Sequence, residues 1–158
     1  MTERRYGVAT ADDVAGLSGL EVMQQMVAGR LPAPPIARTT SIDLVEVGEG
    51  RAVFVGQPGP HLLNPLGIVH GGWALTLIDS ATGCAVHTTL PAGHGFTTVE
   101  TKVNMTKAIR GDGGPVRCEG QVVVRGRQIA TAEARITDES GTILAHGTST
   151  IMILPPRG

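Results

Sequence analysis

Residues 73–87 constrain the fold of this chain more than any other segment. Apolar residues recur there at helical spacing, and further apolar residues occupy the remaining sides of the same helix. A helix that is apolar nearly all round is a buried helix. We therefore expect a central helix enclosed by the other elements of the chain.

The segments after this helix are typical of strands. They alternate polar and apolar residues, most clearly at Arg117, Glu119 and Gln121. Turns rich in glycine and polar residues separate them. The predicted strands are residues 96–109, 116–125, 128–137 and 142–154.

The segments before the helix add three elements. Residues 18–29 predict a short helix, which begins at a serine, ends at a glycine and is followed by an extended, proline-rich turn. Residues 41–57 predict a hairpin, and residues 58–69 a long loop. The predicted class is α+β, with an antiparallel sheet of about six strands wrapped around the central helix. We expect an N-terminal extension over residues 1–35 and one domain over residues 36–158.

Composition restricts the partners. The chain has 158 residues, of which 41% are hydrophobic and 17% charged, and its formal net charge is −1. That size fits one folded core, and no basic block suggests a nucleic-acid or membrane-surface binder. Because neither a signal peptide nor a membrane span is evident, we expect a cytoplasmic protein.

Glycine and cysteine counts are informative too. With 22 glycines and only 3% aromatic residues, the core must rely on small aliphatic side chains and close backbone approaches. Cys84 and Cys118 have no spacing that suggests a disulfide framework or a zinc site, so we interpret both as small buried apolar residues. No metal or redox cofactor is expected.

Asp79 stands in the middle of the apolar helix. An ionised carboxylate is costly to bury without a partner, so Asp79 either does chemical work, lies at an interface or is hydrogen-bonded. The structural alternative is a hydrogen bond to a buried backbone group or to a nearby hydroxyl such as Ser80 or Thr82.

His70, Gly71 and Gly72 stand where the helix begins. Free backbone N–H groups at a helix N-terminus favour a developing oxyanion, and glycine lets a carbonyl approach the chain closely. The structural alternative is that the glycines only turn the loop into the helix and that His70 is a helix-entry residue.

These residues resemble a known family. Asn64, the run from His70 to Gly72 and then Asp79 closely resemble the hotdog-fold acyl-CoA thioesterases of the phenylacetate-pathway (PaaI-like) group. The stretch 98–105 is similar to that group's strand after the central helix. The resemblance covers about residues 20–154 and implies the hotdog fold and hydrolysis of an acyl-CoA thioester.

The resemblance also implies roles for individual residues. Asp79 would be the general base or the nucleophile, and the Gly71 N–H would polarise the thioester carbonyl beside Gly72. His70 would hold the loop or the environment of the carbonyl. Asn64 would position the carbonyl or the water, and Thr97 or Thr98 would orient the attacking water.

Helix geometry implies that two chains share the site. Gly71 and Asp79 are separated by ~12 Å along one helix at 1.5 Å per residue, so one thioester cannot touch both. Antiparallel helices of two subunits would bring them together, in agreement with the homodimer, or dimer of dimers, that the resemblance implies. Arg and Lys suit the phosphates of acyl-CoA, and the candidates are Lys102, Lys107 and Arg110.

Two other functions stay open on this evidence from sequence. One is a hotdog hydratase or dehydratase acting on acyl thioesters. The other is a non-catalytic acyl-CoA binding protein. Release of free CoA thiol separates the thioesterase from both.

Overall fold

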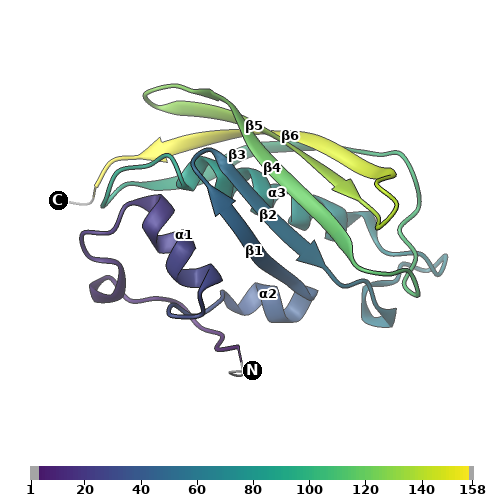
Figure 1. The fold of residues 1–158 in the computed structure, drawn as a ribbon. Coiled ribbons are helices and arrows are strands. Elements are labelled where there is room, and N and C mark those ends of the chain that lie inside the picture. The colour runs from purple at the N-terminus through teal and green to yellow at the C-terminus, as the bar shows by residue number, and fades with distance from the viewer. Residues whose placement is uncertain (1–3, 157–158) are drawn as a thin grey trace.

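The computed structural model describes residues 4–156 of the chain. Its strands form one antiparallel sheet of six, in the order β1-β2-β4-β5-β6-β3. Figure 1 shows the elements, which are α1 (Gly19–Val27), α2 (Pro35–Thr40), β1 (Ile42–Gly48), β2 (Arg51–Gly56), α3 (Gly71–His87), β3 (Gly95–Met105), β4 (Val116–Arg125), β5 (Ile129–Thr137) and β6 (Ile143–Leu154). Short 3-10 helices occupy Asp12–Val14 and Pro60–Leu62.

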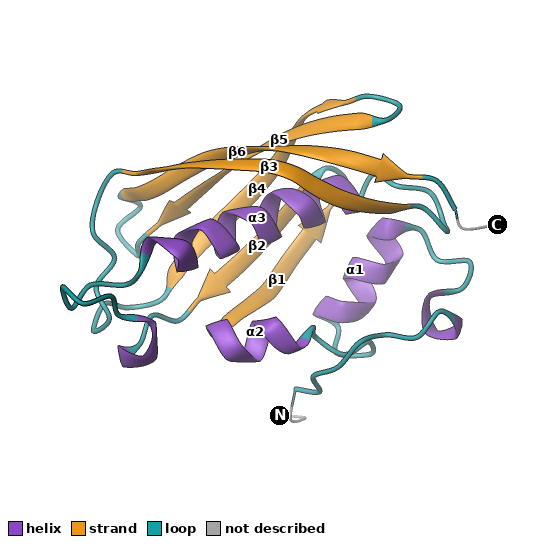
Figure 2. Cartoon of the chain, turned by 180° about the vertical axis from the view of Figure 1, so that it is seen from behind, coloured by secondary structure: helices purple, strands orange, loops and turns teal. Residues whose placement is uncertain are grey.

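The sheet wraps around α3, as the apolar character of this helix predicts. Helix α3 contacts every strand of the sheet and runs along its inner face (Figure 2). Leu77, Ile78, Ala81 and Ala85 are completely buried between them. The prediction of a central helix inside an antiparallel sheet is confirmed.

Glycines on the sheet allow α3 to lie close to it. A Cβ atom on Gly56 would come within 2.7 Å of the Trp73 ring, and one on Gly120 would collide with the carbonyl group of Ala81. Such positions exclude any larger side chain. The expectation of close backbone approaches is therefore confirmed.

Helices α1 and α2 lie beside β1 (Figure 2). Helix α1 begins with a capping box between Ser18 and Glu21, and the Gly19 N–H donates to the Leu90 carbonyl 2.9 Å away. The prediction of an extended turn after this helix is wrong at α2. There Pro35 occupies the first helical turn, where a missing N–H costs nothing.

Strand β3 ends earlier than predicted, at Met105, so the predicted strand over residues 106–109 is wrong. The N–H groups of Thr106 and Lys107 both donate to the Leu144 carbonyl, at 2.9 and 3.0 Å, and this ends the regular ladder. The pairing of β3 with β6 also shifts register between Thr98 and Glu100. Such a β-bulge changes which side chains face inward beyond it.

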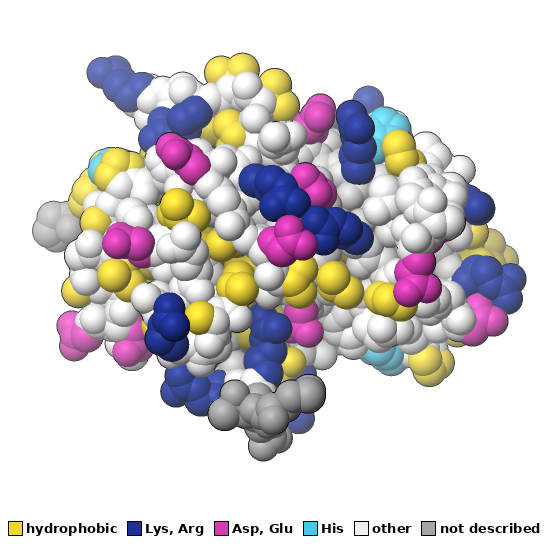
Figure 3. All heavy atoms as spheres, in the orientation of Figure 1, with side chains coloured by type: hydrophobic (Ala, Val, Ile, Leu, Met, Phe, Trp, Pro, Cys, Tyr) yellow, Lys and Arg dark blue, Asp and Glu magenta, His cyan; other side chains and the backbone are white. Residues whose placement is uncertain are grey.

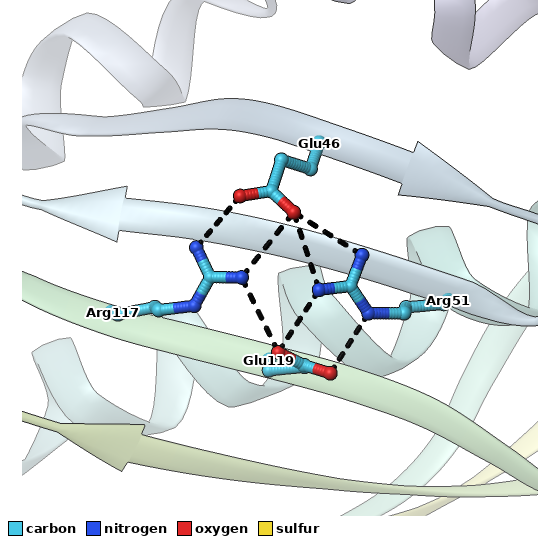
Figure 4. A network of polar contacts seen from close by, with 4 residues as sticks. All are labelled: Glu46, Arg51, Arg117 and Glu119. Atoms are coloured by element: carbon cyan, nitrogen blue, oxygen red, sulfur yellow. Dashed lines mark hydrogen bonds and ion pairs between the residues drawn. The ribbon is translucent and has the colours of Figure 1, made fainter. Parts of the chain in front are cut away.

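An ion-pair network covers the outer face of β1, β2 and β4 (Figure 4). Arg51 bonds Glu119 at 2.8 Å, and Arg117 bonds Glu46 at 2.9 Å. Val53, the cross-strand neighbour of both glutamates, has no exposed surface although it points away from α3. Figure 3 shows this face, with positive and negative side chains gathered together near its middle.

Among residues 4–156, no helix is long and apolar enough to span a membrane. The same residues contain no group of three or more His, Cys, Asp or Glu side chains placed to hold a metal ion. The division into an extension over residues 1–35 and a domain over residues 36–158 stays a prediction.

Candidate functional site

The N-terminus of α3 carries a free backbone donor. His70 is the N-cap, and its Nδ1 accepts the Gly72 N–H at 2.9 Å. The Gly71 N–H donates no hydrogen bond to any of the residues that the structure describes. The amide that remains available is therefore the one on Gly71, at the positive end of the helix dipole.

A pocket of about 310 Å³ borders Gly71. Its wall includes Asn64, His70, Gly71 and the side chain of Met105, whose tip lies so close that a Cβ on Gly71 would come within 2.6 Å of it. The Asn64 Oδ1 accepts the N–H of Leu66 at 2.9 Å, so this side chain also shapes the loop before α3.

Asp79 lies half-buried in the middle of α3 and accepts a hydrogen bond from Thr101. The Thr101 Oγ1 is 3.3 Å from the Asp79 Oδ1. The expected partners Ser80 and Thr82 are not the ones that the carboxylate uses. Thr82 instead bonds the carbonyls of Ile78 and Asp79.

Thr101 is the end of a chain of hydroxyl groups. It lies 2.9 Å from Ser149, which lies 2.7 Å from Thr82, and both of these residues are almost completely buried. Since an ionised carboxylate only accepts hydrogen bonds, Thr101 is the donor to Asp79. The single hydroxyl proton of Thr82 bonds the helix carbonyls, and either atom can donate in the contacts of Ser149 with Thr82 and with Thr101. The Thr101 hydroxyl thus stabilises negative charge on Asp79, and its contact with the buried Ser149 holds it in place.

The sequence interpretation missed Thr101 because of the bulge in β3. Strict alternation from Thr98 places Glu100 on the inner face, whereas the register shift brings Thr101 inward instead. Thr98 lines a pocket together with Asp79, and Thr97 is exposed. The available signal was that Thr101 is a further threonine on the same predicted strand, three residues after Thr98.

The pocket beside Asp79 is separate from the pocket at Gly71. It has a volume of about 170 Å³, and its lining includes Asp79, Cys84, Phe96 and Thr98. Within one chain, Asp79 and Gly71 thus open into different cavities. This arrangement agrees with the ~12 Å that helix geometry places between them.

Neither cysteine is a good nucleophile. Burial, with a further contribution from the charge of Asp79, raises the pKa of the Cys84 thiol to about 12. Burial also raises the pKa of Cys118, which donates to the Leu77 carbonyl at 3.6 Å. Cys118 is buried as predicted, whereas Cys84 is only partly buried. Both thiols stay protonated near neutral pH.

The structure separates the three candidate cations. Lys107 lines the Gly71 pocket and a neighbouring pocket of about 350 Å³, and it forms no salt bridge with another described residue. Arg110 also lines the neighbouring pocket and pairs with Asp112 at 3.0 Å in an exposed position. Lys102 is exposed on β3 and lines neither pocket.

Comparisons with known proteins find similar sequences and similar folds. The model of the thioesterase superfamily matches residues 66–145, about half of the chain. A segment of 35 residues is 54% identical to acyl-coenzyme A thioesterase THEM4 of Xenopus laevis, but it spans only 16% of that protein. The match therefore covers 22% of this chain and only a small part of that relative.

Solved structures share the fold. A thioesterase family protein from Silicibacter pomeroyi is 26% identical, with a TM-score of 0.72 over 84% of this chain and 98% of that one. The conserved protein PA5202 from Pseudomonas aeruginosa is 29% identical, with a TM-score of 0.71 over 76% and 94% of the two chains. The Escherichia coli PaaI protein has the same fold at 20% identity, with a TM-score of 0.70 over 77% and 85%.

The family match covers the end of the loop before α3 from residue 66, the amide at Gly71, Asp79 and the strand that carries Thr101, whereas Asn64 lies just before it. The fold around these residues is the fold of PaaI. The resemblance noted in the sequence is therefore confirmed for the family and for the fold. The chain has the hotdog fold and belongs to the thioesterase superfamily.

Proposed function

We propose that this protein hydrolyses acyl-CoA thioesters to the free acid and CoA. One observation carries the proposal: α3 presents a free amide at Gly71 and a half-buried carboxylate at Asp79, the latter at the end of a hydroxyl chain. A thioester needs no more than this, because its carbonyl is electrophilic and its thiolate leaves readily.

The two groups divide the chemistry. The Gly71 N–H stabilises the negative charge that develops on the carbonyl oxygen, while Asp79 either takes a proton from water or attacks the carbonyl carbon itself. In the first case the hydroxide adds to the carbonyl, the carbon–sulfur bond breaks and CoA leaves as the thiol. Asn64 shapes the loop that presents Gly71, and Thr98 lies near enough to the Asp79 pocket to orient a water.

Each active site is proposed to take Gly71 from one chain and Asp79 from another. Strand β3 is an edge strand of eleven residues, and its exposed Val99 lies at the bulge. An open edge of this length favours pairing with a second chain. Antiparallel pairing of two β3 strands makes the two α3 helices antiparallel, as the shared site requires. A homodimer, or a dimer of dimers, is the expected assembly.

The CoA moiety is proposed to follow the pockets that begin at Gly71. Lys107 and Arg110 stand along this path and supply positive charge for phosphates, whereas Lys102 does not reach it. Free cysteines suit a reducing compartment, and we expect the enzyme to act in the cytoplasm.

The first experiment measures thiol release from a panel of acyl-CoA substrates. The wild-type protein should release CoA, and Asp79→Asn should lower kcat roughly 100-fold or more, because a general base contributes about that much. Its melting temperature should stay the same or rise slightly, since a carboxylate kept for function does not favour folding. An enoyl thioester that changes absorbance without thiol release would instead identify a hydratase. Binding without either reaction would identify an acyl-CoA binding protein.

A second experiment tests the shared site. Asn64→Ala and Asp79→Asn should each be nearly inactive alone, but co-refolded they should recover about a quarter of wild-type activity. Random pairing makes about half of the dimers mixed, and each mixed dimer keeps one intact site. If verified heterodimers stay at the background of the single variants, both residues serve one site from one chain.

A further inference from the structure

Two cavities meet at the side chains of Met26 and Arg4. Both residues line the pocket of about 170 Å³ beside Asp79, and both also line a larger cavity of about 460 Å³ on the far side. That outer cavity includes Val27 and Gly29 at the end of α1. Met26 and Arg4 therefore form the partition between the inner pocket and the outer cavity.

The inner pocket is apolar along the path from Asp79 to this partition. Its lining includes Ile36, Leu44, Phe54 and Phe96. Arg4 contributes at the outer end, where its guanidinium pairs with Asp43 at 2.9 Å. Between Asp79 and Arg4, the two charged residues of its lining, the pocket is mostly apolar and suits a hydrocarbon chain.

The partition comes from a part of the chain that the family match does not include. The thioesterase model covers residues 66–145, whereas Met26, Ile36 and Arg4 lie on α1, α2 and the segment before them. The length of the pocket is thus set by the N-terminal segment of this particular chain.

The volume indicates what the pocket can hold. A cavity of about 150 Å³ holds one benzene molecule, that is about six carbon atoms. The inner pocket is of similar size, at about 170 Å³. Longer chains have to displace the partition or stay in water, and each CH₂ left unburied lowers kcat/KM about fourfold.

We propose that Met26 is the end stop of the acyl pocket and that it limits the enzyme to acyl groups of about six carbon atoms. This inference rests on the proposed function, because it takes the acyl carbonyl to lie beside Asp79. The substrate class is short acyl-CoA, straight or with a single small ring, without a charged end group.

The test compares kcat/KM for acetyl-, butyryl-, hexanoyl-, octanoyl- and dodecanoyl-CoA, measured by thiol release. For the wild type, kcat/KM should rise to about six carbons and then fall. Met26→Ala joins the two cavities and should raise the ratio of octanoyl to hexanoyl kcat/KM at least tenfold, close to the ~15-fold expected for two newly buried CH₂ groups. Met26→Phe should shift the optimum toward shorter chains.

Val27→Ala is the matched control. Val27 is the next residue of α1, is 39% exposed and lines only the outer cavity, so its chain-length profile should match the wild type. Melting temperatures of all three variants establish that they are folded. Because Met26→Phe needs no cavity to form, it keeps the test decisive if the alanine variant does not fold.

Each outcome supports or overturns the inference. Wild-type activity on dodecanoyl-CoA equal to that on hexanoyl-CoA overturns the size limit, and unchanged profiles in both Met26 variants overturn the role of Met26. If no thioester is hydrolysed, the proposed function fails, and calorimetric binding of the same acyl-CoA series still tests the pocket. An affinity that rises up to about six carbons, with an optimum that moves to longer chains in Met26→Ala, supports Met26 as the end of the pocket. An affinity independent of chain length overturns it.

Discussion

Thr101→Val tests whether the hydroxyl chain serves Asp79. Valine has nearly the same shape as threonine, so the substitution removes one hydroxyl and leaves the packing on β3 in place. It deletes the 3.3 Å hydrogen bond to the Asp79 carboxylate and the 2.9 Å contact with Ser149. Ser149 retains its bond to Thr82 at 2.7 Å, so the buried end of the chain keeps a partner.

The expected magnitude follows from these contacts. A hydrogen bond to an ionised group is worth about 1.5–3 kcal/mol, and the lower end applies here because the bond to Asp79 is long and the carboxylate is half-exposed. We expect a loss of kcat of up to roughly tenfold, because Thr101 fixes the orientation of the Asp79 carboxylate, whereas stabilising the ionised ground state does not by itself raise kcat. The lost contact with Ser149 costs about 1 kcal/mol of folding stability, or about 2–4 °C in melting temperature.

The assay is thiol release under saturating substrate, with thermal unfolding of the same samples. Thr148→Val is the control, because Thr148 is exposed on the opposite face of the sheet and should leave kcat unchanged. In an Asp79→Asn background, Thr101→Val should have no further effect on kcat, since the two residues act as one unit. Wild-type kcat in Thr101→Val, or an equal loss in both backgrounds, would refute the role of the hydroxyl chain.

Two further predictions concern stability. Gly120→Ala should lower the melting temperature by several degrees, because the new Cβ meets the rigid backbone of Ala81 and such overpacking costs about 1–3 kcal/mol; an unchanged transition in calorimetry would contradict this. A hydrogen bond from Arg117 lowers the pKa of Glu46, and one from Arg51 lowers the pKa of Glu119. Both carboxylates therefore stabilise the fold above their unfolded pKa of about 4.3. This stabilisation is lost as the pH falls through their lower pKa values in the folded protein. We therefore expect the free energy of unfolding, measured by urea titration at a series of pH values, to fall less steeply below about pH 4.5 in Glu119→Gln than in the wild type. The same steepness in both proteins would contradict this prediction.

Local patterns were enough for most of the architecture. The apolar periodicity of α3 predicts its burial, and the alternation in β4, β5 and β6 predicts strands that end within about one residue of those observed. Asp79 and Gly71 stood out because a carboxylate within an apolar helix, and two glycines where that helix begins, can be recognised from the neighbouring residues in the sequence alone. These features depend on residues close together in the chain, and periodicity reports them directly.

The remaining features depend on contacts between distant segments. The bulge that turns Thr101 toward Asp79 arises from the pairing of β3 with β6, some fifty residues later, and alternation within β3 cannot reveal it. The separation of the Gly71 pocket from the Asp79 pocket, and the meeting of Met26 with that second pocket, arise when α1 and α2 pack beside the sheet. Sequence alone thus determined a buried helix inside a sheet and named candidate residues for thioester chemistry. Tertiary packing decided which hydroxyl bonds the carboxylate and which residues of α1 and α2 border the pocket beside it, because both depend on the distances that folding creates between residues far apart in the chain.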